Sequence, residues 1–146
     1  MKLFKKSIIR GCESRGDSDK PYLIRWTIIE CNAFKLCIHK FLRSDADVMH
    51  DHPWNFWTFI VRRGYIEETP SERYEDSCSS TGELKHKRIK PFSFLWRPAT
   101  HRHRVILMDN KPAWTIVLMG KYVRQWGFWT TKGWQIWNKY FKENGC

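Results

Sequence analysis

The stretch that decides the fold is HDHPWNFWTFIVRRG, residues 50–64, in which two histidines precede a run of aromatic and β-branched residues. His50 and His52 are one residue apart, so on an extended strand both side chains point to the same face. Two imidazoles on one face can bind the same metal ion. The run ends at Arg63-Gly64, which is a turn signal. The stretch therefore predicts strands with a pair of metal-binding histidines beside them.

A second stretch with histidines is RPATHRH, residues 97–103. It is far enough from residues 50–64 along the chain to belong to a separate strand. His101 and His103 are also one residue apart, so strand parity again places both on one face. Their neighbours Arg102 and Arg104 then point to the opposite face. The parity alone does not decide which of the two histidines joins His50 and His52.

In order and spacing, the two stretches resemble the two sequence motifs of the cupin superfamily. The pattern His50-x-His52-x4-Trp57-x6-Gly64 keeps both histidines and the closing glycine of the first motif. Trp57 stands where that motif has its acidic ligand. The resemblance thus implies a metal site that lacks its usual carboxylate.

The second motif is matched by Pro98-x-Thr100-x2-His103, which keeps the proline and the histidine. Thr100 replaces the glycine of the motif, and Leu107 replaces its asparagine. The match places His103 at the ligand position, so the resemblance implies a metal site of His50, His52 and His103. His101 is then an alternative ligand, a fourth ligand or a substrate-binding group.

A closer resemblance is to small bacterial and phage-borne cupin-like proteins, and it covers roughly residues 22–140. It rests on the segments HDHPWNF, RRGYIEE, RPATHRHRV, PAWTIVLMG and RQWGFWTTKGW. It implies a double-stranded β-helix, or jelly-roll barrel, with the pocket inside. It implies no reaction, because cupins include dioxygenases, isomerases, lyases and binding proteins.

The rest of the chain also has the pattern of short strands, because apolar, β-branched and aromatic runs alternate with turn residues. We expect a mainly all-β, single-domain barrel over residues 22–141, after an N-terminal extension or loop of residues 1–21 and before a C-terminal tail of residues 142–146. A short helix is expected from about Lys132. The polar segment 70–87 is expected to run over the surface, near the pocket mouth. The expected strands are 22–31, 33–42, 55–61, 65–68, 92–96, 104–108 and 113–119.

Composition limits the class of protein. The formal net charge is +11 over 146 residues, which attracts anionic partners, but no continuous lysine and arginine tract marks a nucleic-acid tail. No apolar run approaches the ~18 residues that span a bilayer, so we expect no membrane partner and a cytoplasmic location, in the host if the chain is phage-encoded. An odd set of cysteines without a C-x-x-C pair predicts free thiols rather than a disulfide framework. The cysteines are Cys12, Cys31, Cys37, Cys78 and Cys146.

Three neutral imidazoles with open positions can bind one divalent transition metal, with Fe(II) expected first and Zn(II), Ni(II), Mn(II) or Cu(II) as alternatives. Such a ligand set leaves the ion its full positive charge, which favours an anionic substrate. Similar three-histidine sites occur in thiol-dioxygenase cupins, so the resemblance implies a mononuclear iron enzyme. Glu67 and Glu68 could replace the missing carboxylate, although their position favours solvated strand residues.

The substrate-binding residues are expected among the basic and aromatic side chains near the histidines in sequence. Two tyrosines, Tyr65 and Tyr122, are candidates for a catalytic acid or hydrogen-bond donor. The candidates for substrate binding are Arg97, His101, Arg124, Trp57 and Trp96.

Three functions remain open from the sequence. The first is a metal-dependent enzyme, similar to a non-heme iron oxygenase or acting through a Lewis acid, with a small anionic substrate. The second is a metal-free cupin module that sequesters or senses a small anionic, nucleotide-like ligand. The third, favoured only by the net charge, is nucleic-acid binding. A homodimer is compatible with each of them.

Overall fold

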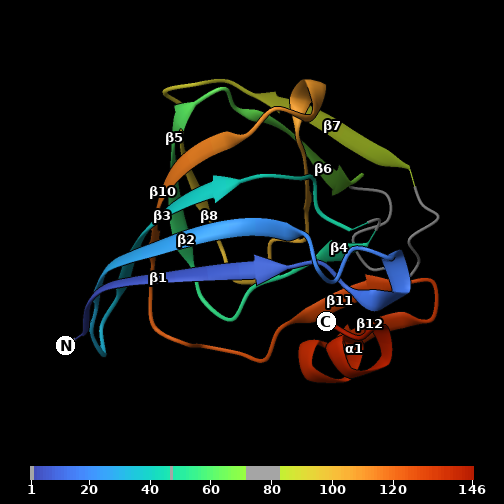
Figure 1. The fold of residues 1–146 in the computed structure, drawn as a ribbon. Helices are drawn as coiled ribbons and strands as arrows, with labels where there is room; N and C mark the ends of the chain where they lie inside the picture. The colour runs from blue at the N-terminus through green and yellow to red at the C-terminus, as the bar shows by residue number, and fades with distance from the viewer. Residues whose placement is uncertain (1, 47, 72–82) are drawn as a thin grey trace.

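The computed structural model describes residues 2–46, 48–71 and 83–146, and these residues form mostly β-strands (Figure 1). Two short 3-10 turns, Glu13–Arg15 and Met108–Asn110, and one helix, α1 (Trp137–Asn144), complete the described structure. The strands are β1 (Lys2–Arg10), β2 (Pro21–Glu30), β3 (Lys35–Phe41), β4 (Met49–His50), β5 (Phe56–Arg62), β6 (Tyr65–Pro70), β7 (Leu84–Ile89), β8 (Phe94–Arg97), β9 (Arg104–Ile106), β10 (Ala113–Met119), β11 (Gly127–Thr130) and β12 (Gly133–Ile136).

The largest sheet has six antiparallel strands in the order β1-β2-β3-β10-β5-β8. Its central strand β10 alternates buried and more exposed residues along AWTIVLM, so Ala113, Thr115, Val117 and Met119 face inward. This alternation is what the period-2 geometry of a strand requires when one face is packed.

Two three-stranded sheets, β12-β11-β4 and β7-β6-β9, form the other side of the structure. They are joined where the backbone N–H of His50 donates to the carbonyl of His103 and the N–H of His103 donates back, both at 3.0 Å. The two sheets thus meet at two of the expected metal ligands.

Apolar contacts between the two sides hold the barrel together. One cluster brings Tyr65 and Val105 from the small sheets against Ile60 and Ala113 of the large sheet, with Phe41 packed beside them. A second cluster lies further along the inner face of the large sheet and consists of Cys37, Phe56, Val117 and Met119. The site lies between elements that these clusters fix in place.

The all-β fold class and the short C-terminal helix predicted from the sequence are confirmed. The N-terminal segment differs from expectation, because residues 2–10 form β1 and pair along β2. Nearly all side chains of β1 are exposed, so this edge strand has no apolar alternation that would reveal it. The segment 70–87, expected to run over the surface, differs too. Residues 84–87 belong to β7, whereas residues 72–82 lie outside the described residues. The helix starts at Trp137 rather than near Lys132, and it includes residues of the expected tail.

The expectation that the cysteines are free thiols is wrong for two of them, because Cys12 and Cys146 form a disulfide. The backbone N–H of Glu13 also donates to the carbonyl of Gly145 at 3.1 Å, so the segment after β1 meets the C-terminus here. A pairing across a sequence separation of 134 residues leaves no local sequence signal. Cys31 and Cys37 are free, and Cys78 lies outside the described residues.

No helix among the described residues is long and apolar enough to cross a membrane. The cytoplasmic location stays a prediction. Disulfides are uncommon in a reducing cytosol, so the Cys12–Cys146 bond does not add support to it.

The disulfide should contribute measurably to stability, because it closes nearly the whole chain into one loop in the unfolded state. We expect Cys146→Ser to lower the free energy of unfolding by roughly 2–5 kcal/mol in chemical denaturation. Cys31→Ser, which removes a free thiol, is the matched control and should leave it nearly unchanged. Equal stability of the Cys146→Ser variant and the wild type in oxidised samples would contradict the bond.

Candidate metal centre

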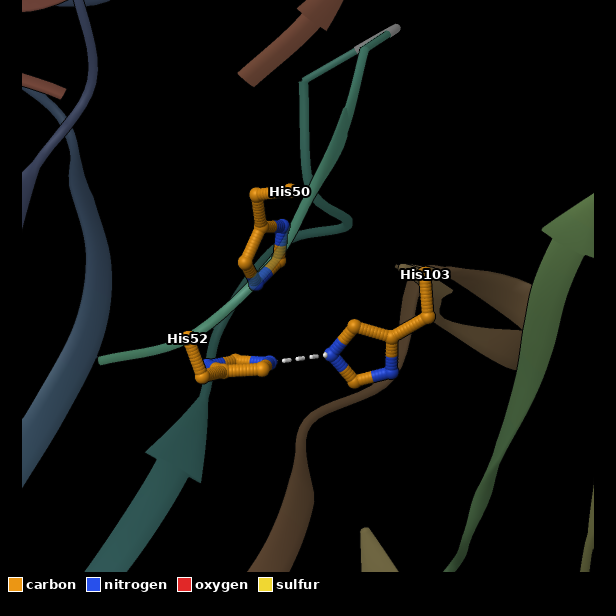
Figure 2. Close-up of side chains that lie close together, drawn as sticks. All are labelled: His50, His52 and His103. Atoms are coloured by element: carbon orange, nitrogen blue, oxygen red, sulfur yellow. Dashed lines mark hydrogen bonds between the residues drawn. The ribbon is translucent and has the colours of Figure 1, made fainter. Parts of the chain in front are cut away.

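The side chains of His50, His52 and His103 converge (Figure 2). His50 lies on β4, His52 lies in the segment after it, and His103 directly precedes β9. The backbone pair described above places the His50 and His103 side chains on one face of the barrel wall. His52 follows two residues after His50, and its N–H donates to the carbonyl of Ala99 at 3.0 Å. The segment that carries His103 is therefore also fixed against His52.

The geometry of the three rings suits a shared ion. Each pair of ring centroids among His50, His52 and His103 is 5.0 Å apart. One nitrogen from each ring lies within 4.8 Å of the others. The Nε2 atoms of His52 and His103 are 2.9 Å apart, a separation compatible with two metal–nitrogen bonds of about 2.0–2.1 Å to one ion. The structure thus brings the three histidines together, and their binding of an ion stays a prediction.

Glu67, on β6, binds the far side of the His103 ring. Its carboxylate accepts hydrogen bonds from His103 Nδ1 at 2.8 Å and from His101 Nε2 at 3.0 Å. Arg97 Nε donates to the same oxygen at 3.1 Å. Because Nδ1 of His103 carries the donated proton, its Nε2 is left with the lone pair that a metal needs.

The expectation that Glu67 and Glu68 are solvated strand residues is wrong, since they are only 2% and 5% exposed. Glu68 is bound by Arg104 and His86. The local sequence does not reveal this burial. Adjacent side chains on a regular strand point to opposite faces, so two neighbouring glutamates are not expected to face inward together.

A second group of potential ligands shares His103 with the first. Glu67, His101 and His103 also have ligand atoms within 4.8 Å of one another. In this group, however, the Glu67 carboxylate already accepts from both histidines and from Arg97. An ion there would have to displace these protons, so the three-histidine group is the better metal site.

Burial keeps the imidazoles of His50 and His52 neutral. It lowers the pKa of His50 to about 3, helped by the charges of His103 and His101. The pKa of His52 is also well below its ordinary value, with burial again the main cause. Burial alone would raise the pKa of Glu67, but hydrogen bonds from His101, His103 and Arg97 lower it below its ordinary value. The centre therefore combines two neutral imidazoles, His50 and His52, with an ionised carboxylate behind His103.

The arginines expected to bind substrate are held by internal carboxylates instead. Arg97 forms an ion pair with Glu67. Arg124 Nη1 lies 2.9 Å from Oδ2 of Asp51, a buried carboxylate that also accepts from the N–H of Gly127 at 2.8 Å. Both arginines thus neutralise buried acids, and the structure gives no sign that either one is free for a ligand. The role of His101 as a substrate group stays a prediction, because its ring is bound to Glu67.

Trp57 and Trp96 do not line the centre, which corrects the expectation that they bind substrate there. Phe56 turns inward and its ring contacts that of His52, so the next residue on β5, Trp57, faces outward. Trp96 is the cross-strand neighbour of Trp57 and shares the outer face. They are 41% and 48% exposed.

The two candidate tyrosines differ in position. Tyr65 is buried in the apolar cluster, two residues before Glu67 on β6. Burial and the charge of Glu67 raise its pKa above the ordinary value, so it can donate a hydrogen bond but is a poor acid. Tyr122 is exposed in the segment between β10 and β11, and its role stays a prediction.

Asp45 is a residue of the site that the sequence analysis did not single out. Its Oδ2 lies 3.8 Å from Nδ1 of His50 and accepts from the N–H of Val105 at 2.6 Å. Burial raises its pKa to about 6. It lies in an irregular segment between β3 and β4, where no strand parity predicts its direction.

No protein-family profile and no curated protein matches the chain. Solved structures do match in fold. The structure of Fe(II)-HppE with the alternative substrate (S)-1-HPP aligns with a TM-score of 0.56 and 10% identity over 79% of this chain. This chain spans only 56% of the length of that protein.

A putative mannose-6-phosphate isomerase from Ralstonia eutropha JMP134 aligns with a TM-score of 0.51 and 20% identity over 68% of this chain and 84% of its own. A cupin superfamily protein from Desulfitobacterium hafniense DCB-2 matches with a TM-score of 0.49 and 9% identity over 68% of this chain and 77% of its own. At such identities the first two likenesses show a shared fold and no shared reaction. They agree with the mainly β-stranded barrel expected from the sequence.

Removing the carboxylate behind His103 should weaken metal binding. Glu67→Gln takes away the charge that holds the proton on His103 Nδ1, so we expect the affinity for Fe(II) or Zn(II) to fall roughly 10- to 100-fold. Glu68→Gln, the adjacent buried glutamate, is the matched control and should have a much smaller effect. Competition titrations against a metal-binding dye measure both. Equal affinities for the two variants would rule out this role of Glu67.

Metal binding should persist at acid pH, because protons compete with an ion for an imidazole only near and below its pKa. An ordinary histidine has a pKa of about 6.5, so its apparent affinity for an ion falls as the pH falls below that value. Since burial lowers the pKa of His50 to about 3, we expect bound metal to be retained at about pH 5 in equilibrium dialysis. A release midpoint near 6.5 would contradict the buried, neutral ligand set.

Proposed function

We propose that this chain is a mononuclear metal-dependent enzyme of cupin-type fold that acts on a small anionic substrate. The observation that supports the proposal most directly is the convergence of the His50, His52 and His103 nitrogens, with Glu67 fixing the tautomer of His103. Iron(II) is the metal we propose first. The fold likeness to a protein crystallised as Fe(II)-HppE supports this choice.

The charges around the centre support an anionic substrate. None of the three proposed imidazole ligands brings a negative charge, and the charge of Glu67 is balanced by Arg97. A divalent ion bound there would keep its positive charge in a largely buried site, where electrostatic attraction is stronger than in water. The neighbour from Ralstonia eutropha is named after a sugar phosphate, mannose-6-phosphate, which is an anion. This name agrees with an anionic class of substrate.

The residues of the chain have definable tasks in this proposal. When bound, Fe(II) would supply redox chemistry with dioxygen, whereas Zn(II) would supply a Lewis acid. Glu67 holds a proton on His103 Nδ1 and so keeps Nε2 directed at the ion. Phe56, whose ring centroid lies 4.5 Å from that of His52, keeps water from one side of the centre. Tyr65, protonated because its pKa is raised, is a candidate hydrogen-bond donor near Glu67.

A second function is favoured by one specific contact. The Nε2 atoms of His52 and His103 lie at hydrogen-bonding distance, so the two rings can also bind each other directly without an ion. Together with Trp57 at the position of the acidic ligand, this arrangement would suit a metal-free module that binds a small anion. Metal analysis separates the two functions.

Protein purified without a histidine tag and loaded anaerobically with Fe(II) should hold about one equivalent of iron. His103→Ala should lose most of it, whereas His86→Ala, an exposed histidine on β7, should not. Nitric oxide added to the loaded protein should give the EPR signal of a ferrous nitrosyl, since three protein ligands leave open positions. Equal iron in the two variants, or a wild type that retains none, would refute the enzyme proposal and favour the metal-free module.

A further inference from the structure

Three polar residues lie side by side on the inner face of the large sheet. Arg25 on β2 is the cross-strand partner of His39 on β3, and His39 is the partner of Thr115 on β10. Side chains at such paired positions on one face are neighbours, with Cβ atoms about 4.5–5.5 Å apart. His39 and Thr115 are buried, so this row lies in the interior of the barrel.

Apolar residues lie on both sides of this polar row. One step along the strands, Cys37 and Val117 belong to one apolar cluster, and one step the other way, Ala113 belongs to the other. Burying polar groups within a core costs free energy unless they have partners. The row therefore needs an explanation that packing alone does not provide.

The positive charge of Arg25 has no carboxylate partner. Its Nε donates to Nε2 of His39 at 2.9 Å, and within residues 2–46, 48–71 and 83–146 it forms no ion pair. Glu30 is near enough to act on its pKa but is bound by Lys35 at 3.2 Å. Arg97 and Arg124, in contrast, each neutralise a buried acid. A partly buried cation left uncompensated is costly, unless an anion binds it.

The other groups in the row offer donors as well. Burial, with the nearby charges of Arg25 and Lys35, lowers the pKa of His39 to about 3, so the ring is neutral. Because its Nε2 accepts from Arg25, its proton is on Nδ1. The buried hydroxyl of Thr115 has no hydrogen-bond partner among the described residues. The terminal N–H groups of Arg25 and this hydroxyl are therefore available to an oxyanion.

The row and the metal centre each have a residue two positions along the chain from the same apolar cluster. His39 is two residues from Phe41, and His103 is two residues from Val105; Phe41 and Val105 both pack in the cluster at one end of the barrel. His39 lies on the large sheet and His103 at the junction of the two small sheets, so the two histidines belong to opposite walls. Packed sheets are about 10 Å apart, and a ligand that contacts both walls would have to cover a distance of this order.

We propose that Arg25, His39 and Thr115 form an oxyanion-binding site for a carboxylate or phosphoryl group, the end of the substrate that is remote from the metal. That the bound group belongs to a substrate rests on the proposed function. The anion site itself does not need the metal. Arg25 supplies the charge and a planar fork of donors, which matches the geometry of both kinds of oxyanion.

The test measures binding of inorganic phosphate and, separately, acetate to metal-free protein at about 0.15 M NaCl, where unspecific surface attraction is screened. Calorimetry gives affinity, and the ¹⁵N shifts of the His39 ring locate the site. Arg25→Met should weaken binding of the preferred anion at least about tenfold. Lys40→Met, which removes an equal charge from the residue next to His39, should not. The anion that binds with the higher affinity identifies the substrate class, a phosphoryl compound for phosphate or a carboxylate for acetate.

Thr115→Val keeps the shape of the side chain and serves if Arg25→Met fails to fold; it should weaken binding several-fold. Equal weakening by Arg25→Met and Lys40→Met, or no shift of the His39 ring with either anion, would overturn the site. The His103→Ala variant separates this inference from the proposed function. Anion binding that persists in that variant supports the site even if the metal proposal fails, and anion binding lost there but retained in Arg25→Met would overturn it.

Discussion

The two reciprocal hydrogen bonds between the backbones of His50 and His103 are the constraint on which the site depends. They join the two small sheets into one wall, and they place one ligand from each stretch of the chain at the junction. Because side chains alternate along a strand, a shift of either segment by one residue would turn its histidine to the other face. Fold and metal centre are therefore set by the same contact, and Glu67 then orients the ring of His103.

Charge balance explains which side chains are free to act. The buried acids Glu67 and Asp51 are each paired with an arginine, as buried charges must be. These pairs stabilise the wall that carries the histidines and leave neither arginine for a ligand. Arg25 has no carboxylate partner among the described residues, and the metal ion that we propose would be a second positive charge inside the barrel. An anionic molecule between the two walls would compensate both.

The sequence predicts much of the fold and the histidine group, because both depend on local spacing. The alternating apolar runs form strands, and His50 ends β4. His52 and His101 lie outside the strands, but His50, His52 and His103 still meet. The pairing of Glu67 with His103, the inward row at Arg25 and the Cys12–Cys146 bond depend on contacts between distant strands, which have no local pattern. Trp57 stands at the motif position of the acidic ligand, but its strand parity, set by the inward-facing Phe56, turns it outward.

The measurement that tests the central claim most directly is an anomalous diffraction map of crystals loaded with Fe(II) or Zn(II). The account predicts one strong peak at bonding distance from Nε2 of His52 and of His103, with the His50 ring as third ligand. A peak bound instead by Glu67, His101 and Nδ1 of His103 would contradict it, because the carboxylate would then be a ligand and not the group that orients His103. Absence of any peak at the three histidines would contradict the metal centre itself.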